Sequence, residues 1–176
     1  YSGRVTDGGN GLGSATSGLG KVIELVNAVR YPASTTPAKN YYNYPRPFRQ
    51  SLDGEDLSWV LQDSLVARVP ATGSGDGGFP SGHTNAAYLS ALGLAYAIPQ
   101  QFSDLVLRAG EIGYSRVVTG IHSPLDVIGG RMHATYYAIA DLMANPTLRA
   151  EAYAQAQAFF SEKCGGSVSE CYTSGK

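Results

Sequence analysis

The chain has 176 residues, of which 43% are hydrophobic and 15% are charged, so it is long and apolar enough to bury the core of one domain. A formal net charge of −1 excludes attraction of nucleic acid or acidic lipid through bulk charge, and the longest mostly apolar stretch, 86–98, is too short to span a bilayer. No secretory signal sequence is recognised at Tyr1, and we expect a soluble protein, or a mature or trimmed form of one.

The first half of the chain predicts little regular structure. Residues 1–20 contain seven glycines and indicate a flexible segment. Apolar residues at helical spacing predict a helix over 21–30. The Tyr-, Pro- and Asn-rich residues 31–53 predict irregular structure. A helix of moderate strength is predicted over 55–68, and a loop over 69–80.

The second half predicts four long helices, over about 82–98, 102–117, 124–143 and 146–163. Ser123 is expected to cap the third helix, with Pro124 in its first position, and Asn145 to cap the fourth. We find no alternating strand pattern and no internal repeat. The sequence therefore predicts an all-α fold with a single helical domain over 21–163.

The two cysteines lie in the segment CGGSVSEC, within an expected C-terminal tail over 164–176. A disulfide between Cys164 and Cys171 would contribute roughly 2–3 kcal/mol and would indicate an export compartment, periplasmic or secreted. The alternative is two free thiols in a flexible tail. A four-cysteine zinc site is excluded by the count.

Three clusters of residues carry groups suited to phosphate chemistry. They are Lys39 with Arg46 and Pro47, then Pro80-Ser81-Gly82-His83, and then Ser115-Arg116 with His122 and Asp126. Together they supply three cations, two histidines, one carboxylate and the start of a helix. A phosphate dianion needs several cationic donors, and a helix N-terminus with a glycine lets backbone N–H groups approach it.

Two histidines can divide the work of phosphoryl transfer between a nucleophile and an acid. Asp126 lies four residues after His122, at a helix start that favours a negative charge. Its carboxylate can accept a proton from one ring nitrogen of His122 and leave the other nitrogen free to attack phosphorus.

The clusters resemble the signature of the phosphatidic-acid phosphatase type 2 and vanadium haloperoxidase superfamily, in which Lys-x6-Arg-Pro precedes Pro-Ser-Gly-His and then Ser-Arg-x5-His-x3-Asp. Every fixed position of that signature is filled between residues 39 and 126. The segments GHTNAAYLSALGLA and MANPTLRAEAYAQAQAFF are similar to the soluble bacterial class A non-specific acid phosphatases. This resemblance implies a compact helical bundle and a metal-independent acid phosphatase without a cofactor.

The resemblance also implies a role for each residue of the site. His122 is the expected nucleophile that forms a phosphohistidine, Asp126 orients it, and His83 is the expected general acid. The phosphate oxygens are expected to bind Lys39, Arg46 and Arg116, together with Ser81 and the Gly82 amide. The expected partner is a small-molecule phosphomonoester, with neither polymeric nucleic acid nor a transmembrane anchor, and family members suggest a homo-oligomer.

Two features depart from the family pattern. Family enzymes usually carry further helices before the motif lysine, whereas 38 residues precede Lys39 here. The position after the nucleophile is often aromatic, and here it is Ser123, so we expect a more open pocket.

Three other functions compete with that of an acid phosphatase. A vanadium-dependent haloperoxidase would use the same anion site, with vanadate bound to His122, but those enzymes are much larger. A lipid-phosphate phosphatase of the integral type would need membrane spans, which the sequence does not predict. A soluble enzyme could still act on amphiphilic substrates. An inactive anion-binding module conflicts with the presence of both histidines.

Several residues favour structural roles. The cluster Tyr41, Tyr42 and Tyr44 favours packing over substrate stacking, and His133 favours a structural histidine. Gly129-Gly130 favours close helix packing. The acidic run around residues 53–56 favours a solvated helix start.

Overall fold

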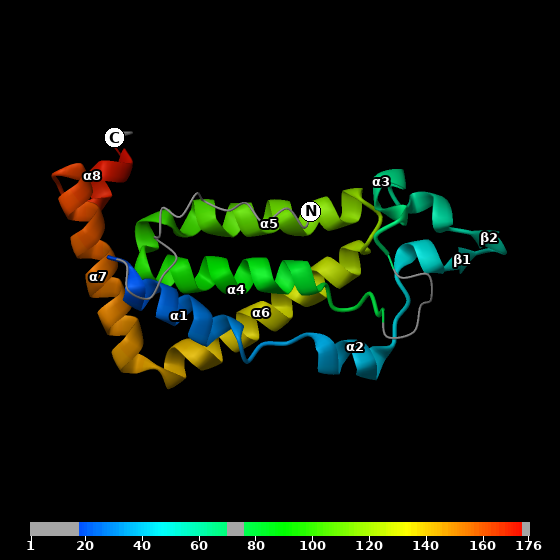
Figure 1. The fold of residues 1–176 in the computed structure, drawn as a ribbon, viewed down its shortest axis with the longest axis horizontal. Coiled ribbons are helices and arrows are strands. Elements are labelled where there is room, and N and C mark those ends of the chain that lie inside the picture. The colour runs from blue at the N-terminus through cyan, green and yellow to red at the C-terminus, as the bar shows by residue number, and fades with distance from the viewer. Residues whose placement is uncertain (1–17, 70–75, 174–176) are drawn as a thin grey trace.

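The structure is a computed structural model, and it describes residues 18–69 and 76–173. The helix Gly82–Ala97 (α4) lies at its centre (Figure 1). Helices α1, α5, α6 and α7 all pack against α4 (Figure 1). Both α4 and α6 begin at the end of the bundle where α2, α3 and a small hairpin lie. The flexible segment predicted over 1–20 lies mostly outside the described residues, and Gly20 already begins α1.

The described part of the chain is largely helical, so the predicted all-α class is confirmed. Its elements in chain order are α1 Gly20–Arg30, α2 Thr36–Tyr42, a 3-10 turn Pro47–Arg49, β1 Ser51–Leu52, β2 Glu55–Asp56, a 3-10 turn Ser58–Val60, α3 Asp63–Val66, α4 Gly82–Ala97, a 3-10 turn Pro99–Gln101, α5 Phe102–Val118, α6 Pro124–Ala144, α7 Pro146–Cys164 and α8 Val168–Thr173.

The long helices follow the predicted ranges to within one or two residues. Ser123 caps α6 as expected, because its hydroxyl accepts the Asp126 N–H at 3.2 Å. Asn145 stands at the start of α7 but does not cap it. Its side-chain amide instead donates to the Asp141 carbonyl at 2.8 Å, one turn back on α6.

Two predictions for the first half are wrong. Helix α2 forms inside the segment predicted to be irregular. It has seven residues, too few to show a helical period, and Asn43 ends it in the left-handed conformation with φ of 42°. In place of the helix over 55–68 the chain forms the β1–β2 hairpin, two short helical turns and a loop. Asp53 and Gly54 both have positive φ, 51° and 87°, which suits a two-residue hairpin turn.

The acidic run around residues 53–56 therefore lies in this hairpin and does not start a helix. Its side chains are exposed. The Asp53-Gly54 pair is the local sequence signal for this hairpin turn. The tyrosines before it are exposed as well, and Tyr41 is 83% exposed. The rings of Tyr41 and Tyr42 nevertheless pack edge to face with centroids 5.1 Å apart, as the packing interpretation predicts.

Small residues let the central helices approach closely. Buried alanines of α4, α5 and α6 form one core cluster with Val29, Tyr88 and Leu89. At Gly130 of α6 an added Cβ would lie 2.5 Å from the carbonyl oxygen of Ser81. Only a glycine therefore allows α6 to reach the turn that precedes α4, as the prediction of close packing at Gly129-Gly130 required.

The C-terminal segment contains more structure than the predicted tail. A disulfide joins Cys164, the last residue of α7, to Cys171 in α8. Gly165 ends α7 with φ of 68°, and Val168 is buried in a second core cluster with residues of α1 and α7. His133 has a structural environment, since its ring lies 2.9 Å from the Asn85 side-chain oxygen.

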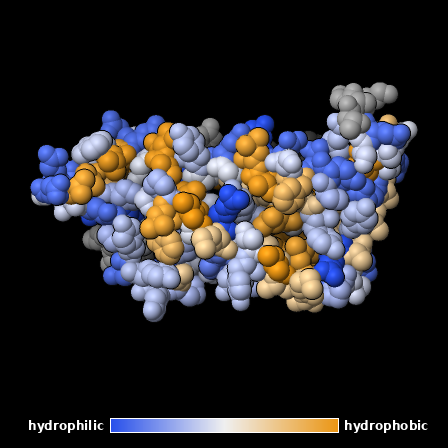
Figure 2. All heavy atoms as spheres, turned by 180° about the vertical axis from the view of Figure 1, so that it is seen from behind, coloured by the Kyte–Doolittle hydropathy of each residue, from blue (hydrophilic) through white to orange (hydrophobic). Residues whose placement is uncertain are grey.

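Apolar side chains also reach the surface. Figure 2 shows several apolar patches on the face opposite to that of Figure 1. Helix α6 exposes Leu125, Ile128, Met132, Tyr136, Ile139 and Met143. Even so, among the helices of the described residues none combines the length and the hydropathy needed to cross a bilayer.

Substitution of Gly130 by alanine should separate α6 from the turn before α4. The new Cβ would meet backbone at 2.5 Å, so we expect a loss of about 1–3 kcal/mol in the free energy of unfolding. Urea denaturation followed by circular dichroism measures this loss.

The matched control is Gly110→Ala in α5, where the added Cβ has its nearest contact at 3.4 Å, with the Tyr88 hydroxyl. That variant should gain about 0.5–1 kcal/mol from helix propensity. Equal midpoints for the two variants would contradict the proposed close contact.

Candidate active site

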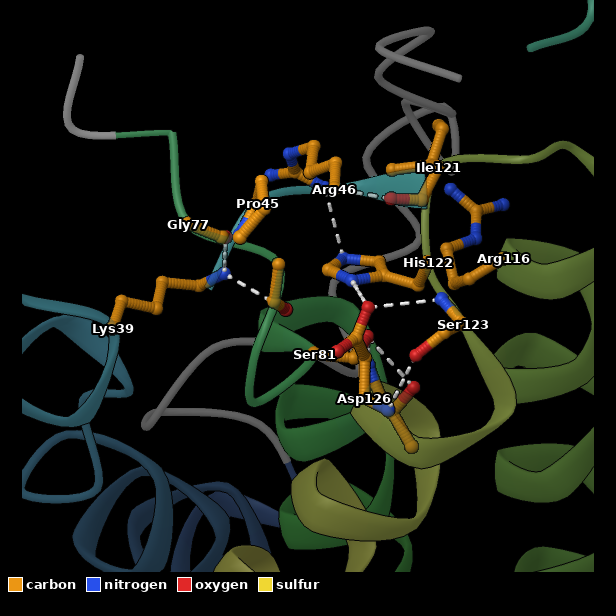
Figure 3. Close-up of polar contacts among 12 residues, drawn as sticks. Lys39, Pro45, Arg46, Gly77, Ser81, Arg116, Ile121, His122, Ser123 and Asp126 are labelled. Carbon is orange, nitrogen blue, oxygen red and sulfur yellow. Dashed lines mark hydrogen bonds and ion pairs between the residues drawn. The ribbon is translucent and has the colours of Figure 1, made fainter. Parts of the chain in front are cut away.

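His122 lies in the turn between α5 and α6 and is almost completely buried. Gly120 turns the chain after α5 with φ of 72°, and a Cβ there would lie 1.9 Å from the Val60 carbonyl oxygen. The His122 N–H then donates to the Arg116 carbonyl at 3.1 Å. This turn holds the imidazole between α4 and α6 with its two nitrogens facing different groups (Figure 3).

The Nδ1 edge of the His122 imidazole faces a carboxylate. Its Nδ1 lies 3.3 Å from Asp126 Oδ2, and the same oxygen accepts the Ser123 N–H at 2.9 Å. Because the Ser123 hydroxyl in turn accepts the Asp126 N–H, the two residues form a capping box at the start of α6. The residue that departs from the family pattern therefore fixes the carboxylate that faces the histidine.

The other nitrogen of His122 faces Arg46. The Arg46 Nη1 lies 3.1 Å from Nε2 of His122 and donates to the Ile121 carbonyl at 3.2 Å. A guanidinium can only donate, so Nε2 must be the accepting nitrogen and Nδ1 carries the proton toward Asp126. The lone pair of Nε2 is thus directed at the cations rather than at the protein interior.

Five of the predicted residues meet in one hollow of about 320 Å³. It is lined by Lys39, Arg46, Gly82, His83, Ala86 and His122. The Lys39 ammonium donates to the carbonyl of Gly77 and lies 3.4 Å from that of Gly78. The hollow therefore joins two cations, two histidines and the N-terminus of α4.

The N-terminus of α4 leaves donors available beside the hollow. Within the described part of the chain, the N–H groups of Gly82 and His83 have no acceptor. They point along the positive end of the helix dipole, which favours an anion there. A tetrahedral anion in this hollow would meet backbone donors on one side and side-chain cations on the other.

Two predicted phosphate contacts are not among the residues that line this hollow. Arg116 is half-buried and donates through Nε and Nη2 to the Ser115 hydroxyl, at 3.0 and 2.9 Å. Ser81 is fully buried, and its hydroxyl accepts from Thr84. Ser81 thus caps α4 in this structure, and its contact with phosphate stays a prediction, as does that of Arg116.

Burial, together with the nearby cations, changes the proton affinities of the residues in the hollow. Burial and the nearby Arg46 lower the pKa of Lys39 to about 8. Burial, opposed by Asp126 and assisted by Arg46, lowers the pKa of His122 below its ordinary value. Partial burial and the charges of Arg116, His122 and Arg46 likewise lower the pKa of His83. Both histidines therefore favour the neutral form in the absence of an anion.

Sequence reasoning missed the residues that hold the cations. Asp76 accepts from Arg46 Nε at 2.7 Å and from Arg49 Nη2 at 3.2 Å. The carbonyls of the next two residues, Gly77 and Gly78, accept from the Lys39 ammonium. Segment 76–78 lies within the loop predicted over 69–80. Its signal was an Asp-Gly-Gly sequence immediately before the second motif cluster.

Comparisons with known proteins find matches over much of the chain. Residues 20–147 match the family profile described as the PAP2 superfamily. The chain is 37% identical over 100 residues to a non-specific acid phosphatase of Salmonella typhi, which covers 56% of this chain and 36% of that protein. It is 40% identical over 73 residues to a non-specific acid phosphatase of Providencia stuartii, covering 42% of this chain and 29% of that protein. Similarity also extends to an acid phosphatase of Zymomonas mobilis, at 32% identity over 99 residues, 56% of this chain and 34% of that protein.

Binding of inorganic phosphate should weaken above pH 8. The pKa of Lys39 is lowered to about 8, so its charge is present below that pH and lost above it. We expect the dissociation constant to rise by up to about tenfold per pH unit above this point. Isothermal titration calorimetry at pH 7.5, 8.5 and 9.5 measures this change.

The control is Lys39→Arg, which keeps its charge throughout this range. Its phosphate affinity should be nearly independent of pH between these values. A wild-type affinity that is equally constant would contradict the role of Lys39 as an anion ligand.

Proposed function

The chain belongs to the PAP2 superfamily, and from this membership we propose that it is an acid phosphatase that hydrolyses phosphomonoesters through a phosphohistidine on His122, without a metal ion. The observation that carries this proposal is the orientation of His122. Its Nδ1 faces Asp126, whereas its Nε2 opens toward Lys39 and Arg46 in the hollow. A nucleophile needs this free lone pair beside groups that neutralise the phosphate charge.

In the proposed first step a phosphate monoester occupies the hollow and draws the Arg46 Nη1 away from His122. The Nε2 lone pair then attacks phosphorus while the bond from phosphorus to the leaving oxygen breaks. His83 donates its proton to that oxygen, so an alcohol departs and the phosphoryl group stays on His122. Asp126 stabilises the positive charge that the imidazole gains.

In the second step water replaces the alcohol. Neutral His83 removes a proton from the water, whose oxygen attacks phosphorus as the bond from phosphorus to Nε2 breaks. Inorganic phosphate leaves, His122 returns to the neutral form and His83 is protonated again. Both steps use the same cations, because the transferred group keeps its negative charge on the equatorial oxygens.

An acidic optimum follows from the pKa of His83. The general acid must be protonated, and its pKa in the substrate-free protein lies below the ordinary value. Activity should therefore be lost as the pH rises through this lowered pKa. A bound phosphate dianion would favour protonated His83 and raise its pKa, so kcat should persist to higher pH than kcat/KM.

The relatives support the reaction class by name, since three of them are called acid phosphatases. The matched segments cover only about a third of the lengths of these relatives. The activity of the whole protein, its small phosphomonoester substrates and a homo-oligomeric state are therefore part of the proposal. The Cys164–Cys171 disulfide supports a periplasmic or secreted location. We also propose that vanadate inhibits phosphate release competitively, because five-coordinate vanadate resembles the transition state of phosphoryl transfer.

Replacement of His122 by alanine should abolish turnover of an aryl phosphate in buffer containing EDTA. Rapid quenching of the wild type should trap a phosphoenzyme that is labile to acid and stable to base. Peptide mapping should place the phosphoryl group on His122. His133→Asn is the matched control and should still form the phosphoenzyme, because His133 contacts Asn85 and lies outside the hollow. A phosphoryl group mapped to a serine or an aspartate would contradict the proposed phosphohistidine.

Replacement of His83 by alanine should cost about 10²–10⁴-fold in rate with an alkyl phosphate, whose leaving alcohol needs a proton. With 4-nitrophenyl phosphate the loss should be much smaller, because nitrophenolate leaves without one. The comparison is made by steady-state kinetics with both substrates on one preparation. Equal losses for the two substrates would remove His83 from the role of the acid.

A further inference from the structure

Asp76 joins the cation that faces the nucleophile to a second arginine. Its Oδ1 accepts from Arg46 Nε at 2.7 Å and its Oδ2 accepts from Arg49 Nη2 at 3.2 Å. The three side chains are only 13–18% exposed, so these ion pairs are largely shielded from water. Charge-assisted hydrogen bonds are stronger than neutral ones, and partial shielding from water weakens them less than full exposure does, so Asp76 can hold Arg46 in a defined geometry.

The contacts of Arg46 differ in whether the reaction can keep them. The Nη1 of Arg46 lies 3.1 Å from His122 Nε2, and this contact must break before Nε2 can attack phosphorus. The bond from Nε to Asp76 involves a different nitrogen and can persist throughout. Once Arg46 turns toward phosphate, Asp76 is therefore the charged partner that keeps the guanidinium beside the nucleophile.

The same short segment also holds the second cation. The carbonyls of Gly77 and Gly78, directly after Asp76, receive the Lys39 ammonium. Burial and Arg46 lower the pKa of Lys39, whereas the carboxylates of Asp126 and Asp76 raise it. Asp76 thus orients one phosphate ligand and helps to keep the other one charged.

We propose that Asp76 is a positioning residue that fixes Arg46 for phosphate binding and transfer, and that segment 76–78 aligns both Arg46 and Lys39. The proposal rests on the function proposed above, because it takes these two cations as phosphate ligands. Asp76 itself does not touch the substrate. It acts mainly through Arg46, so most of the effect of its removal on turnover should require Arg46, whereas its effect on Lys39 should be seen in the pH dependence of phosphate binding.

The test uses Asp76→Asn, which keeps the shape of the side chain and removes its charge. We expect kcat/KM for 4-nitrophenyl phosphate to fall by about 10–100-fold, because a small misplacement of a clamping group has effects of this size. In the Arg46→Gln background the same substitution should cost less than about threefold, since coupled residues are not additive. Asp76→Glu, which retains the charge, should recover part of the loss.

The matched control is Asp53→Asn in the β1–β2 turn. It removes the same charge at an exposed residue whose positive φ of 51° suits asparagine, so kinetics and midpoint should both stay unchanged. Thermal unfolding of every variant shows whether a loss of activity reflects a loss of fold. If Asp76→Asn is poorly folded, the comparison of Asp76→Glu in the wild-type and Arg46→Gln backgrounds takes its place.

Binding of inorganic phosphate, followed by calorimetry, provides a second measurement that needs no turnover. In Asp76→Asn the weakening of phosphate affinity with pH should begin below pH 8, because Lys39 has lost a charge that raised its pKa. A purely structural role would leave this pH dependence where it is in the wild type.

Three results would overturn the proposal: unchanged kinetics in folded Asp76→Asn, an equal loss in the presence and absence of Arg46, or an unchanged pH dependence of phosphate binding. Failure of the proposed function gives a different result. In that case the wild type would release no phosphate from any monoester, while the binding measurement would still test Asp76.

Discussion

The hydrogen bond from the Ser81 N–H to the Asp126 carbonyl, at 2.8 Å, brings the starts of α4 and α6 together. It forms only because Gly130 lets α6 reach the backbone of Ser81. With the two helix starts in contact, a residue just before α6 and a residue in the first turn of α4 can share one hollow. His122 and His83, 39 positions apart in the sequence, meet for this reason.

The two helix N-termini serve different purposes at this junction. The start of α6 is occupied by its own capping box, which fixes the Asp126 carboxylate against Nδ1 of His122. The start of α4 keeps the N–H groups of Gly82 and His83 available within the described residues. One helix start therefore orients His122, the proposed nucleophile, while the other favours the anion that His122 is proposed to attack.

The cations come from less regular parts of the chain. Lys39 lies on the short helix α2, Arg46 lies in the turn after it, and segment 76–78 provides their acceptors. Burying these charges and holding them together without an anion has a cost, which is visible in the lowered pKa of Lys39. A bound phosphate would relieve that cost, and in the proposed mechanism it also turns the Nη1 of Arg46 away from His122.

Much of this could be predicted from residue patterns. The helical period placed α4 to α7, Ser123 and Pro124 marked the start of α6, and the motif spacing identified both histidines, Asp126, Lys39 and Arg46 as residues of one site. Helix α2 and the hairpin at Asp53–Gly54 were missed, because elements of seven residues or fewer carry almost no period.

The sequence by itself therefore determined the helical class, the long helices and the chemical groups of the site, since these depend on local propensity and on residue type. Only the tertiary structure decided which nitrogen of His122 faces Arg46, that Ser81 is turned inward as a cap, and that Asp76 joins Arg46 to Arg49. Those facts depend on contacts between residues far apart in the chain. No local pattern encodes such contacts, because they exist only once α4 and α6 have packed together.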